Sequence, residues 1–147
     1  KRYAGNRVLK IAIPIALALF FLGMAVYWLF PKTVDIEKSR NFDKEEVEVA
    51  IKETIELLDA EEYAALQENA IPQMQSFLNA ETRESMRKTL SDDWGERKQF
   101  GAVYMAEVIQ GNKHLAVGEM TVTYENVSVT YRLSYDEDLR LAGIYVR

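Results

Sequence analysis

An uncharged run of 20 residues, 11–30, limits what the rest of the chain can fold into. It forms most of the apolar stretch VLKIAIPIALALFFLGMAVYWLF, which extends from Val8 to Phe30. Twenty helical residues rise about 30 Å, the thickness of the hydrocarbon core of a bilayer. We therefore predict a transmembrane helix over residues 8–30.

The charges that flank this stretch predict its orientation. Four basic residues and no acidic residue precede the uncharged run 11–30: Lys1, Arg2, Arg7 and Lys10. By the positive-inside rule, residues 1–7 form a short cytoplasmic end and the chain after residue 30 is extracytoplasmic. The sequence thus predicts a single-pass protein of the cell membrane.

A cleaved signal peptide is the alternative interpretation of the same residues. Gly23-Met24-Ala25 has the small-x-small pattern of a cleavage site. The residues that follow it, VYWLF, extend the apolar run beyond an ordinary signal-peptide core, so we favour the retained anchor.

Composition limits the partners of the part that follows. Residues 31–42 form a short polar tether, and residues 43–147 have the length of one domain. After the anchor the chain has 14 basic and 23 acidic residues, a balance that disfavours binding to nucleic acid. Cysteine is absent, which excludes disulfides and thiolate metal sites.

The first half of this domain has helical periodicity. Asp43 is a candidate N-cap, and Glu46 follows three residues later. A helix is expected over residues 44–58, since apolar residues recur there at helical spacing. Further helices are expected over residues 60–69 and, after a cap at Asn79, over residues 80–94, where Trp94 would join the buried stripe.

From residue 100 onward the period changes to that of strands. Residues 127–135 alternate apolar and polar side chains, as in a strand with one wet face. Three more strands are expected over residues 100–109, 115–124 and 139–146, and the short turns between them favour antiparallel neighbours. We predict an α+β fold in which helices pack on a curled four-stranded antiparallel sheet.

Four segments of this domain resemble a known family. They are LLDAEEYAAL from Leu57, Trp94, FGAVYMAEV from Phe100, and RLSYDEDLRLAGIYV from Arg132. Together they resemble domain of unknown function 3887, and the likeness covers most of residues 43–147. The resemblance implies a cystatin-like, or nuclear-transport-factor-two-like, cone and brings no catalytic residues. Leu139 departs from it, because a glycine is expected in that turn.

Five strand residues are the candidate ligand-binding residues. Three tyrosines, Tyr104, Tyr124 and Tyr131, could edge an apolar concavity under a curled sheet, although core packing is the favoured interpretation because aromatic residues are common in strands. Glu107 and Glu119 are the mid-strand carboxylates that a cone-pocket isomerase or lyase would use for proton abstraction.

No catalytic or metal-binding motif accompanies these residues. His114 is the single histidine, lies beside the turn Gly111-Asn112-Lys113, and no G-x-S-x-G motif is present. The acidic run Asp136-Glu137-Asp138 lacks the glycine and distal glutamate of a calcium loop. The sequence therefore marks out no catalytic residue, no metal site and no cofactor.

Two functions of different classes follow. The favoured one is a non-enzymatic, membrane-anchored extracytoplasmic module that binds a protein partner or a small apolar ligand. The alternative is an enzyme of isomerase or lyase type that uses a buried carboxylate. A filled interior would favour binding through the outer face of the sheet, whereas an apolar cavity that contains Glu107 or Glu119 would favour the enzyme.

Overall fold

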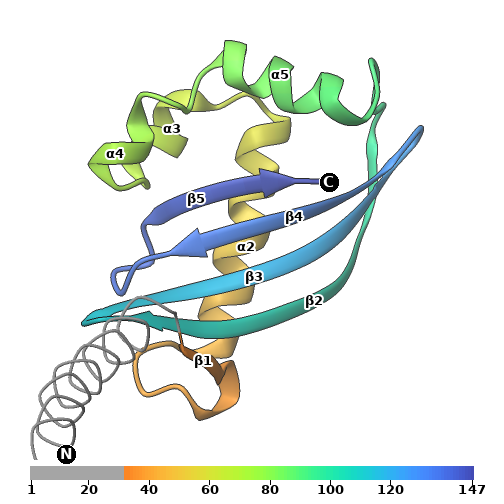
Figure 1. The fold of residues 1–147 in the computed structure, drawn as a ribbon. Coiled ribbons are helices and arrows are strands. Elements are labelled where there is room, and N and C mark those ends of the chain that lie inside the picture. Colours follow the sequence, from red (N-terminus) through yellow and green to blue (C-terminus); the bar gives the residue numbers. More distant parts are fainter. Residues whose placement is uncertain (1–31) are drawn as a thin grey trace, which may run out of the picture.

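The computed structural model describes residues 32–147 as an antiparallel sheet with a long helix, α2, across one face (Figure 1). Each strand pairs with its neighbour in the chain, so the sheet order is β1-β2-β3-β4-β5. The elements are β1 (Lys32–Asp35), the 3-10 helix η1 (Ile36–Lys38), α2 (Lys44–Asp59), α3 (Tyr63–Glu68), α4 (Pro72–Gln75), α5 (Ala80–Leu90), β2 (Arg97–Gln110), β3 (Lys113–Tyr124), β4 (Ser128–Tyr135) and β5 (Leu141–Val146).

The prediction of a four-stranded cone is wrong, because the sheet has five strands. The additional strand, β1, lies in the segment expected to be a tether and pairs with the end of β2, from Lys32 opposite Ile109 to Asp35 opposite Ala106. It has four residues, KTVD, with a single strongly apolar side chain. A strand this short has no alternation to detect, and its partner lies more than 60 residues away in the sequence.

The predicted span over residues 8–30 and the cytoplasmic end over residues 1–7 lie outside the described residues. Among the helices of residues 32–147, none has both the length and the apolar character needed to cross a bilayer. The extracytoplasmic location stays a prediction.

Helix α2 covers the inner face of the sheet. It begins where expected, since the Asp43 carboxylate accepts hydrogen bonds from the backbone N–H groups of Glu45 and Glu46, at 2.9 and 3.1 Å. Its apolar stripe is fully buried against the sheet and comprises Val47, Ile51, Ile55 and Leu58. A Cβ atom on Gly118 of β3 would lie 2.3 Å from Ile51 Cδ1, so this glycine permits the close approach of α2.

The alternation of β4 determines which side chains meet α2. Tyr131 and Leu133 are fully buried on the inner face, and Thr130 and Arg132 lie on the other face, as the pattern predicts. Inner-face residues of β3 are buried in the same way: Ala116, Gly118, Met120, Val122 and Tyr124. The interior between α2 and the sheet is therefore filled by side chains.

Three short helices cover the β5 side of the sheet (Figure 1). The last, α5, begins at the expected cap, where the Asn79 side chain accepts from the N–H of Thr82 at 2.9 Å. It ends at Leu90 rather than at Trp94, because Ser91 is extended. Outside the helix Trp94 reaches the core, 3% exposed, with its indole N–H donating to the Arg87 carbonyl at 3.0 Å.

Candidate functional site

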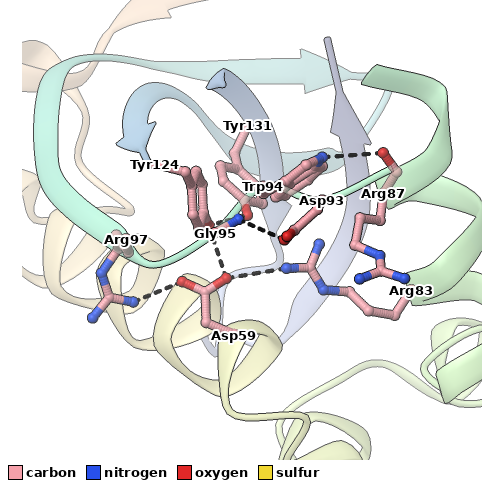
Figure 2. Close-up of polar contacts among 9 residues, drawn as sticks. All are labelled: Asp59, Arg83, Arg87, Asp93, Trp94, Gly95, Arg97, Tyr124 and Tyr131. Carbon is pink, nitrogen blue, oxygen red and sulfur yellow. Dashed lines mark hydrogen bonds and ion pairs between the residues drawn. The ribbon is translucent and has the colours of Figure 1, made fainter. Parts of the chain in front are cut away.

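A polar pocket of about 610 Å³ opens between the C-terminal end of α2, the start of α5 and the loop before β2. Asp59, the last residue of α2, lies in its wall and accepts three hydrogen bonds (Figure 2). The donors are Arg83 Nη2 at 3.1 Å, Arg97 Nη1 at 2.8 Å and the Tyr124 hydroxyl at 2.8 Å. One carboxylate thus joins α2, α5, β2 and β3, and both of its oxygens are occupied.

Two tyrosines extend this cluster into the core. Because Tyr124 donates to Asp59, the Tyr131 hydroxyl donates to that of Tyr124, at 2.6 Å. Burial raises the pKa of Tyr124, and burial also raises the pKa of Tyr131 to about 12. Both hydroxyls are protonated at neutral pH, so neither acts as a base.

Trp94 packs against both tyrosines (Figure 2). Its ring centroid lies 5.1 Å from that of Tyr124 and 6.4 Å from that of Tyr131, and the Arg83 guanidinium lies 4.7 Å above it. We name Asp59, Arg83, Arg97, Tyr124 and Tyr131 the buried network. Its bonds are directed at one another rather than at the pocket, which is the arrangement of a structural junction.

Two nitrogens near this network lack partners. Arg83 Nη1 and Arg87 Nε are buried without a hydrogen bond to any described residue. Arg87 nevertheless pairs with Glu84 at 2.6 Å, Arg83 and Arg97 share Asp59, and the further acids Glu61, Asp93 and Glu96 line the same pocket, so the acids of its wall outnumber the cations. The pocket therefore offers hydrogen-bond donors but no unbalanced positive charge.

Glu107 lies on the inner face of β2, only 2% exposed, and holds the loop before α2. It accepts from Ser39 Oγ at 2.8 Å, from Asn41 Nδ2 at 2.8 Å and from His114 Nδ1 at 2.6 Å. Burial acts to raise its pKa, but the hydrogen bonds from Asn41, Ser39 and His114 outweigh burial and hold the pKa below its ordinary value. Glu107 is thus an ionised clamp.

This clamp contains a serine, a histidine and a carboxylate, yet it is not a nucleophilic triad. The Ser39 hydroxyl donates to Glu107 rather than to His114, so the histidine is not positioned to activate it as in a triad. His114 is the second residue of β3 and contacts the same carboxylate. Its role here is to anchor the loop to the β2–β3 hairpin.

Glu119 and Tyr104 lie on the opposite, outer face of the sheet. The strand register places four residues side by side on β2, β3, β4 and β5: Tyr104, Glu119, Arg132 and Tyr145. We name these four the outer row. Adjacent strands are about 4.8 Å apart, so the row spans about 14 Å. Its two tyrosines are 75% and 61% exposed, unlike the buried tyrosines of the inner face.

Short side chains lie beside the outer row. The next set across the same strands is Ala106, Val117, Ser134 and Gly143. Two shallow hollows result, one of about 270 Å³ beside Tyr104 and one of about 400 Å³ beside Tyr145, and Arg132 borders both. On the outer face, therefore, two exposed tyrosine side chains project at the ends of the row, and a shallow hollow lies beside each of them.

A third concavity of about 440 Å³ lies between α2 and the β4–β5 turn. Its lining includes the apolar residues Val49, Leu57 and Leu139 and the acids Glu45 and Glu53. None of the five predicted ligand-binding residues lines it.

The five predicted residues fall in three separate places. Tyr124 and Tyr131 belong to the buried network, Glu107 to the clamp, and Tyr104 and Glu119 to the outer row. Sequence reasoning missed Asp59, Arg83 and Arg132. The position of Arg132 could have been predicted, because the alternation of β4 places it on the face of the sheet opposite to that of Tyr131. The ion pairs of Asp59 could not, because they join elements that are distant in the sequence and leave no local signal.

Comparison with known proteins adds a family but no activity. The family model described as "Protein of unknown function (DUF3887)" matches residues 52–144. A search of curated proteins found no match. An NMR structure of a protein from Ruminococcus gnavus ATCC 29149 is similar, with a TM-score of 0.67 and 30% identity over 78% of this chain and 98% of that one. Within residues 32–147, no group of three or more His, Cys, Asp or Glu could hold a metal ion.

Proposed function

This chain belongs to the DUF3887 family of proteins of unknown function, and we propose that it is a non-enzymatic domain that binds a protein partner through the outer face of its sheet. The observation that carries the proposal is the outer row. It places two exposed tyrosines at the ends of a row on four adjacent strands, with the acid Glu119 and the base Arg132 at its two middle positions.

The residue types of the outer row are those of protein interfaces. Tyrosine and arginine are enriched among the residues that contribute most to binding energy, because they combine large contact area with hydrogen-bonding groups. The hollows beside Tyr104 and Tyr145 are shallow and border Arg132, which suits side chains of a protein surface better than a small molecule that must be enclosed.

The enzyme alternative has less support. A pocket isomerase or lyase needs a carboxyl group whose pKa is raised by an apolar cavity. Glu107 has a lowered pKa and three hydrogen-bond donors around it, and Glu119 lies on the outer face, where Arg147 Nη2 approaches it at 3.3 Å. Neither carboxylate has the surroundings of a catalytic base.

Photocrosslinking in cells that express the full chain tests the proposal. A benzophenone amino acid replaces Tyr145 in one chain and Phe77 in a control, since Phe77 is 58% exposed but lies between α4 and α5. The proposal predicts a discrete protein adduct from position 145 and none of comparable yield from position 77. Equal yields at both positions, or no adduct from position 145, would refute binding through the outer face.

A further inference from the structure

We infer that the partner for which the outer row is built is a second copy of the same chain, a conclusion that rests on the proposed use of the outer face for binding. The order of the row is tyrosine, acid, base, tyrosine. When such a row is reversed and laid on itself, each acid meets a base and each tyrosine meets a tyrosine. The row is therefore complementary to its own reverse.

The strand register specifies the symmetry axis that produces this match. A twofold axis parallel to the strands, between β3 and β4 and midway between the two facing sheets, reverses the row. It brings Glu119 of each copy opposite Arg132 of the other, and Tyr104 opposite Tyr145. A twofold axis across the strands would instead place Glu119 opposite Glu119. Only the first arrangement is favourable, because like charges directly opposite one another are repulsive.

The neighbouring residues on the outer face fit the same axis. Ala106 would lie opposite Gly143 of the second copy, and Val117 opposite Ser134, so short side chains face one another. On the other side of the row, Thr121 and Thr130 form a hydrogen-bonded pair at 3.1 Å and would meet the same pair reversed. Arg147 continues the threonine set beyond Thr130, bonds to Glu119 of its own copy at 3.3 Å, and would face the β2 side of the second copy rather than the second Arg147. No like-charged pair therefore lies directly opposite in these three sets, and closed twofold contacts use one patch twice in this way.

Charge-reversal variants of the full chain test the inference by sedimentation in a non-ionic detergent, which keeps the apolar residues 8–30 dissolved. Glu119→Arg alone and Arg132→Glu alone would each create two repulsive contacts, and each is expected to weaken self-association more than about tenfold. An equimolar mixture of the two variants restores both attractive contacts, so the dimer returns.

Association through residues outside the described part would not follow this charge pattern. Single variants that dimerise like the native chain, or a mixture that fails to recover the dimer, would overturn the inference. The double variant Glu119→Arg/Arg132→Glu provides a matched control, because it has the native composition and regains both attractive pairs. It is expected to dimerise.

The orientation has its own test, since the native chain contains no cysteine. Chains with Tyr104→Cys and with Tyr145→Cys are treated with a short bismaleimide, separately and mixed. Crosslinking in the mixture but in neither separate sample is expected, while efficient crosslinking of either chain alone would contradict the axis. If the native chain is monomeric and position 145 still crosslinks to a different protein, self-docking fails while the proposed function stands. Absence of any adduct refutes both.

Discussion

The buried network and the outer row use the same kinds of side chain for different ends. Each combines two tyrosines with acidic and basic groups. In the buried network both guanidinium groups bond to Asp59 and the tyrosine hydroxyls bond to one another, so most of its hydrogen bonds are made within the fold; Arg83 Nη1 is the exception. In the outer row the tyrosines face solvent on β2 and β5, and Glu119 and Arg132 lie on the two strands between them.

The difference is a matter of burial rather than of residue type. A charge taken out of water is tolerated only when it is paired, and removing one partner leaves the other uncompensated. Exposed pairs contribute little to stability and are free to serve recognition. Substitutions in the buried network should therefore change stability, and substitutions in the outer row should change association.

Replacing a tyrosine by alanine should show the largest difference in stability between the buried network and the outer row. Tyr131→Ala removes a fully buried ring that also donates to Tyr124, and we expect a loss of about 3–5 kcal/mol in the free energy of unfolding. Tyr104→Ala should change it by less than about 0.5 kcal/mol. Urea titration of both variants gives the comparison, and similar midpoints would show that the two faces are assigned wrongly.

Neutralising the acids should give a somewhat smaller contrast. Asp59→Asn removes the charge that two guanidinium groups and a phenol share, and we expect a loss of about 3 kcal/mol. Glu119→Gln should cost less than about 0.5 kcal/mol in the same urea experiment. A loss for Asp59→Asn no larger than that for Glu119→Gln would contradict the junction role of the buried network.

The clamp at Glu107 should appear in the pH dependence of stability. Because the folded-state pKa of Glu107 is lowered, its contribution is present above the unfolded pKa of about 4.3 and is lost as pH falls through the folded value. Glu107→Gln should therefore flatten the loss of stability on acidification below about pH 5. Asn41→Ala, which removes one of the bonds that lower this pKa, should flatten it less. Equal slopes in all three proteins would exclude the clamp.

A substitution just after the end of α2, next to Asp59, should have the smallest effect on the free energy of unfolding. Glu61 follows the helix with φ 56°, a left-handed conformation that glycine adopts without strain. Glu61→Gly should stabilise the fold by about 1 kcal/mol or less, whereas Glu62→Gly, at φ −85°, should not. Calorimetric melting of each variant distinguishes them. A higher melting temperature for Glu62→Gly, and not for Glu61→Gly, would contradict the claim that the backbone of Glu61 is strained.

The fold was predictable where a local pattern encodes burial. The start of α2 and the facing of β4 follow from a cap and from alternation, and both are confirmed. Leu139, where a glycine is expected, has φ 57°. The strand β1 escaped prediction because four residues with one strongly apolar side chain contain no period, and its place depends on pairing with distant residues.

The candidate site was less predictable. Its five predicted residues are tyrosines and glutamates of neighbouring strands, but they do not lie on the same face of the sheet. Tyr104 and Glu107 are three residues apart on one strand and therefore face opposite sides of the sheet, as do Glu119 and Tyr124. Parity alone separates these pairs. The ion pairs of Asp59 with Arg83 and Arg97 are different, since they exist only once the elements have packed.

The central claim is that the outer row serves binding and the buried network serves stability. The most direct test is the crosslinking yield from position 145 in the full chain that also has Arg132→Glu, compared with the yield when Arg132 is retained. We predict that the adduct is lost in the Arg132→Glu chain, while its urea midpoint changes no more than is usual for a substitution at an exposed position. An undiminished adduct in the Arg132→Glu chain would contradict the claim.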